Sequence, residues 1–207
     1  MSLFPRALGP LVITMLCVIA TPEALAAKPP LTGGAAYQAE PEPPRMATPG
    51  RWTGEEVPGT VAEILPDGTA AAPADAPEQV KQAIWASNWL QDKPYKYGGG
   101  HGRLRDTGYD CSGAVSFALN AGGLLETPLD SGSFMAWGER GVGEWITVYA
   151  NPGHAYVVIA GLRLDTSAAG VSRAAGRVTR AALEEGPRWR PMLRSPRGYT
   201  RRHPLSF

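Results

Sequence analysis

The sequence has little cysteine, little histidine and no long apolar run. Two cysteines and three histidines occur among its 207 residues. They do not stand in the paired Cys or His spacing of zinc sites, so we expect no metal ligands and no other cofactor. The apolar run over residues 7–20 contains Pro10 and is shorter than the ~20 residues of a membrane-spanning helix, which argues against an uncleaved anchor. The formal net charge of +1 indicates no class of partner.

Residues 1–26 have the features of a signal peptide. Arg6 supplies a positive start, Leu11–Ala20 is apolar, and Ala24-Leu25-Ala26 is a small-x-small cleavage pattern. We therefore expect a secreted, periplasmic or cell-wall-associated protein without stable membrane insertion after cleavage. Cys17 is preceded by a large residue, which argues against lipid modification, and cleavage removes it. The mature chain then keeps one cysteine, Cys111.

Composition divides the mature chain into three parts. Residues 27–60 are rich in Pro and Ala with little apolar periodicity, which predicts a disordered linker. Residues 61–170 carry the patterns of one folded domain that begins with a short hairpin near 61–68. Residues 171–207 hold nine arginines against two glutamates, and we expect this basic C-terminal extension to wrap on the domain.

The arginine-rich extension invites three interpretations. Nucleic acid is excluded as a partner, because an exported protein meets little of it. Binding to anionic cell-envelope polymers is a second interpretation, and a solvated surface is the ordinary one. Residues 27–80 are acidic, with three basic against eight acidic residues. The two ends of the mature chain therefore carry net charges of opposite sign. We expect a monomer.

Periodicity predicts two helices followed by three antiparallel strands, which is an α+β order. Residues 77–91 have an apolar stripe at helical spacing, and its two tryptophans are expected in the core rather than on a binding face. A second helix is expected from Cys111 to Ala121, closed by Gly122 or Gly123. Strands are predicted at 145–149, 155–160 and 162–166.

Cys111 follows a glycine-rich turn at residues 95–102 and begins the second predicted helix. So many glycines indicate a tightly approached backbone. The unpaired amides and the dipole at a helix N-terminus favour thiolate over thiol. An unpaired cysteine in an exported protein is either an intermolecular link or a reactive thiol. A small buried hydrophobic residue is the alternative role, but the helix position favours a nucleophile.

A thiol nucleophile needs a base and a group that orients the base. His154 begins a predicted strand, and Asp165 lies on the next strand, which returns beside it after a tight turn. Cys111, His154 and Asp165 are therefore predicted to form a cysteine hydrolase site. Alternatively, His154 and Asp165 each stabilise only a turn. His101 lies between two glycines, and we expect it to be dispensable because nothing local fixes its rotamer.

Three segments together resemble the NlpC/P60 family of cell-wall peptidases: Tyr95-Lys96-Tyr97-Gly98-Gly99, Tyr109-Asp110-Cys111-Ser112-Gly113, and Gly153-His154 at the start of a strand. The resemblance covers roughly residues 80–167. It implies a papain-like α+β core in which the helix bearing Cys111 packs on an antiparallel sheet bearing His154 and Asp165. It also implies that Asp110, Ser112 and Tyr97 contact substrate.

The chain departs from the family pattern at two places. Residues 144–149 replace the family's Pro-Gly-Asp turn, and Asp165 stands where the family more often has histidine. An acid is chemically sound there, because a carboxylate that accepts from Nδ1 stabilises the imidazolium. We expect Asp165→Asn to lower activity strongly with little loss of stability.

The resemblance implies hydrolysis of amide bonds in peptidoglycan stem peptides. The Cys111 thiolate would attack the carbonyl, backbone N–H groups at the helix start would hold the oxyanion, and His154 would protonate the leaving amine. Water would then hydrolyse the thioester. A non-catalytic wall-binding module and an acyltransferase on the same scaffold are the alternative functions.

Overall fold

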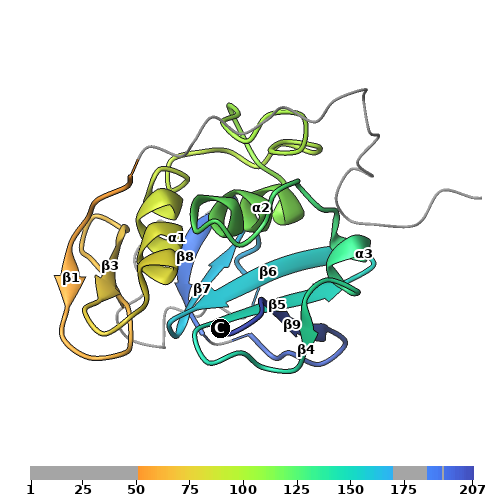
Figure 1. The fold of residues 1–207 in the computed structure, drawn as a ribbon. Coiled ribbons are helices and arrows are strands. Elements are labelled where there is room, and N and C mark those ends of the chain that lie inside the picture. The colour runs from red at the N-terminus through yellow and green to blue at the C-terminus, as the bar shows by residue number, and fades with distance from the viewer. Residues whose placement is uncertain (1–50, 170–185, 193) are drawn as a thin grey trace, which may run out of the picture.

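The computed structural model describes residues 51–169, 186–192 and 194–207. The expected signal peptide, most of the expected linker and the first part of the basic extension lie outside these residues. The described part is an α+β structure, as predicted: helices pack on a large antiparallel sheet, with a small second sheet beside them (Figure 1).

The large sheet has six strands in the order β4-β9-β5-β6-β7-β8, and every neighbouring pair is antiparallel. Its centre is the predicted meander, confirmed as β5 (Ile146–Asn151), β6 (His154–Ile159) and β7 (Leu162–Asp165). These strands form because alternate apolar residues can be buried on one face of a sheet. On that face lie Ile146, Val148, Ala155, Val157, Ile159 and Leu164, all buried.

The remaining strands of this sheet are β4 (Glu139–Arg140), β8 (Arg188–Pro191) and β9 (Thr200–His203). β8 and β9 belong to the region 171–207, which we expected to wrap on the domain as an extension. In its described residues this region instead completes the sheet, because β9 pairs with β4 on one side and with β5 on the other. The side chain of Thr200 adds a hydrogen bond to the carbonyl oxygen of Ala150 at 2.9 Å.

Two helices cover the apolar face of the sheet: α1 (Glu78–Asn88) and α2 (Cys111–Ala121) (Figure 1). They pack against each other, and α2 also packs on β6 and β7. The α1 tryptophan Trp85 is buried, and Trp89, at the helix end, stacks on Phe117 of α2 with ring centroids 5.5 Å apart. The core role expected for both tryptophans is confirmed. A short helix, α3 (Ser131–Phe134), packs against β5 and β6.

The small sheet has the order β1-β3-β2, with β1 at Glu56–Val57, β2 at Glu63–Ile64 and β3 at Ala70–Pro73. The expected hairpin corresponds to the antiparallel pair β2–β3. Residues 51–60, which we placed in the linker, contribute β1 and Trp52. The Trp52 ring packs edge-on against Phe117 at 6.2 Å, and the backbone of Trp52 is hydrogen-bonded to the side chain of Gln82. These contacts and the pairing of β1 with β3 order a segment of otherwise linker-like composition.

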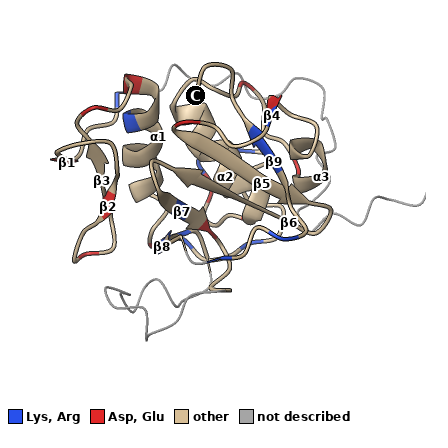
Figure 2. Ribbon diagram, turned by 90° about the horizontal axis from the view of Figure 1, so that it is seen from below, with Lys and Arg blue, Asp and Glu red and all other residues tan. Residues whose placement is uncertain are grey.

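The described residues retain the charge difference between the two ends of the chain. Acidic residues gather on the elements around β1 and β2, and basic residues lie along β8 and β9 (Figure 2). Within the described ranges, no helix is both long enough and apolar enough to cross a membrane.

Candidate active site

Cys111 is the first residue of α2, and its side chain is almost fully buried at 2% exposure. The helix begins here because Asp110 caps it: the carboxylate Oδ1 accepts the backbone N–H of Gly113 at 2.7 Å. The predicted start of the helix is thus confirmed. Cys111 therefore lies at the end of the helix where the first backbone N–H groups have no partner within the helix.

The glycine-rich turn packs tightly against this helix start. Gly98 donates its N–H to Oδ2 of Asp110 at 3.0 Å, and Asp110 donates its own N–H to the carbonyl of Gly99 at 3.2 Å. A Cβ atom on Gly113 would lie 2.0 Å from the carbonyl oxygen of Gly99. The glycines are therefore required by a close approach of two backbones, as the sequence indicated.

His154 and Asp165 meet across neighbouring strands. His154 begins β6 and Asp165 ends β7, so the antiparallel register brings them together, and His154 Nε2 lies 2.8 Å from Asp165 Oδ1. We expected the acid to bind Nδ1. Because Asp165 binds Nε2 instead, Nδ1 is left for the hydrogen bond that His154 makes with Cys111.

The imidazole of His154 is stabilised in its protonated form. Burial alone would lower its pKa, but hydrogen bonds and charge interactions with Asp165 and Cys111 raise the pKa to about 9. At neutral pH the residue is therefore an imidazolium. Such a cation stabilises a neighbouring thiolate and is ready to donate a proton.

Asp165 is a buried carboxylate with several partners. Its Oδ1 also accepts the backbone N–H of Ser167 at 2.9 Å, and its Oδ2 lies 2.9 Å from Arg194 Nη1 and 3.4 Å from Arg163 Nε. Burial raises the pKa of Asp165, but His154, Ser167 and Arg163 outweigh it and hold the pKa below the usual value. At neutral pH the Asp165 carboxylate is thus negatively charged and the His154 imidazole is positively charged, so the two form an ion pair.

The three residues predicted to contact substrate lie in different environments. Asp110 and Ser112 are fully buried. Asp110 caps α2, while Ser112 Oγ lies 3.2 Å from His101 Nε2 and donates to Asp110 Oδ1 at 3.3 Å. Tyr97, in contrast, is 66% exposed on the glycine-rich turn. Substrate contact by these residues stays a prediction, and the structure gives Asp110 a role in building the helix start.

His101 is held more firmly than expected. It is only 4% exposed, and its Nε2 lies 3.0 Å from Asp110 Oδ1 and 3.2 Å from Ser112 Oγ. The expectation that nothing fixes its rotamer is therefore wrong. The flanking glycines suggested a mobile turn, but they allow the turn to fold inward onto the buried Asp110 carboxylate.

Sequence reasoning also missed Arg194, which contacts Asp165, and Tyr199, whose hydroxyl accepts a hydrogen bond from Arg194 at 2.5 Å. Both lie between β8 and β9, in a stretch without periodicity, so the sequence carries no signal that would place them here. Within the described ranges, no group of three or more His, Cys, Asp or Glu side chains is arranged to hold a metal ion.

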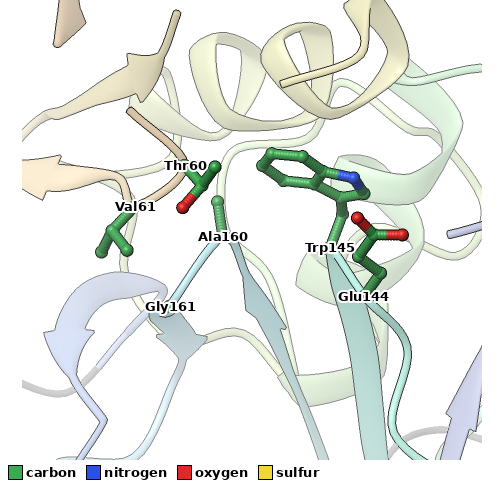
Figure 3. Close-up of a pocket in the computed structure, with 6 residues that line it drawn as sticks. All are labelled: Thr60, Val61, Glu144, Trp145, Ala160 and Gly161. Carbon is green, nitrogen blue, oxygen red and sulfur yellow. The ribbon is translucent and has the colours of Figure 1, made fainter. Parts of the chain in front are cut away.

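A separate pocket of about 300 Å³ lies at the other end of β6 (Figure 3). It is lined by Thr60, Val61, Glu144, Trp145, Ala160 and Gly161. Ala160 directly follows β6, whereas His154 is the first residue of that strand. The pocket is therefore distinct from the Cys111–His154–Asp165 site.

Comparisons with known proteins find similarity among solved structures but not among sequences. No protein-family model matches the sequence, and no curated protein matches it either. Among solved structures, the chain is similar to the peptidoglycan hydrolase RipB from Mycobacterium tuberculosis, with 21% sequence identity and a TM-score of 0.41. The similarity covers 61% of this chain and 64% of the RipB chain, which is less than two thirds of that structure.

Proposed function

We propose that the protein is an exported cysteine hydrolase that cuts amide bonds in peptidoglycan stem peptides. One observation carries the hydrolase part of the proposal. Cys111 at the N-terminus of α2 is hydrogen-bonded to His154, and His154 is hydrogen-bonded to Asp165 at 2.8 Å. Nucleophile, base and orienting acid in this order are what acyl transfer by a thiol requires.

The substrate class rests on the sequence. The segments around Tyr97, Cys111 and His154 resemble those of NlpC/P60 cell-wall peptidases, and residues 1–26 resemble a signal peptide. Together they favour peptidoglycan as substrate and a location outside the cytoplasmic membrane. Tyr97, exposed beside the helix start, is the residue we propose to contact the peptide.

The proposed mechanism begins with the thiolate of Cys111, which attacks the amide carbonyl. Backbone N–H groups at the start of α2 stabilise the negative charge that develops on the carbonyl oxygen. The imidazolium of His154 then gives its proton to the leaving amine, and Asp165 keeps the ring in the orientation that this transfer needs. Water attacks the thioester, His154 accepts its proton, and the free thiolate returns.

The test is digestion of purified peptidoglycan, with released fragments identified by mass. Wild type should release peptide fragments, and Cys111→Ser and His154→Ala should release essentially none while remaining folded, as judged by a cooperative melting transition. His203→Ala is the matched control, because His203 lies on β9 away from the candidate site and should keep activity. Near-normal turnover by Cys111→Ser would refute the nucleophile assignment.

The same assay separates the alternatives. An acyltransferase would attach the peptide to an added amine in preference to water, which gives a product of different mass. A wall-binding module would sediment with peptidoglycan and release nothing, in wild type and variants alike. Either outcome would replace the proposed hydrolysis.

A further inference from the structure

The carboxylate of Asp165 is held at both oxygens by charged side chains from different parts of the chain. Oδ1 accepts from His154, and Oδ2 accepts from Arg194 Nη1 at 2.9 Å. Arg194 lies 29 residues later in the sequence, in the segment 194–199 between β8 and β9. The acid of the candidate triad therefore depends on a residue outside the segments that resemble the peptidase family.

Arg194 is itself held in place by two tyrosines beside His154. Its Nη2 donates to the hydroxyl of Tyr199 at 2.5 Å, and its guanidinium lies 5.3 Å from the Tyr156 ring centre and 5.2 Å from that of Tyr199. Tyr156 is fully buried on β6, two residues after His154. A guanidinium that is hydrogen-bonded and placed over aromatic faces loses most of its rotamer freedom.

Tyr199 connects this arrangement back to the histidine. Its ring lies edge-on to the His154 ring at 6.4 Å, and its hydroxyl is also hydrogen-bonded to Asn151. Asn151 is the residue of β5 that pairs with His154 in the sheet. Arg194, Tyr199 and Asn151 thus form a continuous chain of contacts around the imidazole.

The other charged groups near Asp165 are less well placed to orient its carboxylate. Arg163 Nε is 3.4 Å from Oδ2, and its Nη2 is bound to the carbonyl oxygen of Ala169. Arg190 Nε donates to the backbone carbonyl of Asp165 at 3.1 Å and so fixes the main chain. Among these arginines, Arg194 makes the short contact with the carboxylate.

We propose that Arg194 is a positioning residue for Asp165: it fixes the rotation of the carboxylate so that Oδ1 faces His154 Nε2. The inference rests on the proposed cysteine hydrolase function. It makes the segment 194–199 a functional part of the candidate active site. The side chain of Arg194 is 16% exposed. If a shorter residue replaced Arg194, a small solute could therefore enter the space that the guanidinium group now fills.

The test compares Arg194→Gln and Arg194→Lys with wild type, and Arg197→Gln serves as the matched control because Arg197 is exposed on the same segment. The first readout is the rate at which iodoacetamide alkylates Cys111 between pH 5 and pH 9, which needs no substrate. The second is kcat and KM for release of stem peptides. Melting curves accompany both.

Arg194→Gln should lower kcat about 10- to 100-fold with KM little changed, since misplacement of a catalytic group by about 1 Å costs about that much. It should also slow alkylation at pH 6, where reactivity depends on the thiolate–imidazolium pair. Arg194→Lys should recover part of both losses, and Arg197→Gln should match wild type. In Arg194→Ala, added methylguanidinium should restore part of the activity.

Two failures are distinguishable. If folded wild type releases no stem peptides from peptidoglycan, the proposed hydrolase function fails. If wild type reacts fast and Arg194→Gln matches it in alkylation and kcat, the positioning role fails and the hydrolase stands. Should Arg194→Gln not fold, Tyr199→Phe removes one acceptor of Arg194, and an unchanged kcat and pH profile in this variant would overturn the inference.

Discussion

The side chain of Asp165 takes part in two kinds of interaction. It accepts a hydrogen bond from His154, and it is the counter-charge of Arg163 and Arg194 in a buried place. A neutral amide could still accept the hydrogen bond from His154, but it has no negative charge to stabilise the imidazolium or to neutralise the two arginines. The structure therefore changes our expectation that replacement of Asp165 affects activity alone.

Asp165→Asn should lose activity and stability together. The matching Asp-to-Asn change in a serine protease lowers turnover by roughly 10⁴-fold. We take this as the upper bound of the activity loss here, because a thiolate nucleophile depends less on the acid than a neutral serine hydroxyl does. The free energy of unfolding should fall by about 3–5 kcal/mol, since two buried cations lose their carboxylate. Hydrolysis assays and urea melts measure both, with the exposed Asp75→Asn as control. A fully stable Asn variant would show that the arginines find other partners.

The raised pKa of His154 predicts how stability varies with pH. Its pKa is about 9 in the folded chain against 6.5 for an unperturbed histidine, so the folded state holds the proton more tightly. This stabilisation is complete below about pH 6.5 and is lost as pH rises toward 9, by at most about 3 kcal/mol. His154→Gln should remove that decline. Melting temperatures of both proteins from pH 6 to pH 10 test it, and parallel curves would contradict it.

At the level of elements, the contact between the glycine-rich turn and α2 sets the position of the nucleophile. Ala normally stabilises a helix by about 1 kcal/mol relative to Gly. At position 113 we expect alanine to destabilise the protein instead, because a Cβ would lie 2.0 Å from the Gly99 carbonyl oxygen and 3.2 Å from Asp110 Oδ1. Backbone atoms cannot move aside cheaply, and such overpacking costs about 1–3 kcal/mol.

Gly113→Ala should therefore melt at a lower temperature and lose activity, because the start of α2 must shift away from the turn. Gly102→Ala is the control, since a Cβ there has no atom of the described residues within 4 Å. Thermal melts and peptide release measure the difference. Equal stability of the two variants would mean that the turn moves freely relative to the helix.

The sequence predicted the elements whose apolar pattern is local. The stripe on α1, the helix after Asp110 and the alternation of β5 to β7 each follow from residues within one segment. The pairing of His154 with Asp165 was also predictable, because consecutive antiparallel strands bring such positions together.

Elements held by distant partners were not predictable. β9 is the polar segment Thr-Arg-Arg-His, and its place in the sheet follows from main-chain pairing with β4 and β5. Arg194 contacts Asp165 because β8 and β9 direct the segment between them back to the site. His101 turns inward toward a buried carboxylate that no local pattern reveals.

At the level of the whole molecule, β9 joins two parts of the large sheet. It lies between β4 and β5, so its removal would leave β4 without a strand partner and expose one edge of β5, which would keep only its pairing with β6. A chain that ends after Tyr199 should therefore lose cooperative unfolding and aggregate. Circular dichroism melts and gel filtration test this, with Leu205→Ser, at an exposed position, as control. A soluble, cooperatively folded truncated chain would show that β9 is dispensable.

The place of β9 also has a consequence for the order of events during synthesis. Thr200 bonds to Ala150, 50 residues earlier, and pairing over such separations is slow. The ribosome makes Cys111 first, then His154 and Asp165, and only later Arg194 and β9. A growing or clipped chain thus holds its thiol without the last strand and without the arginine that orders the acid. Arg194 and β9 are thus the last parts of the candidate site and of the large sheet to be synthesised.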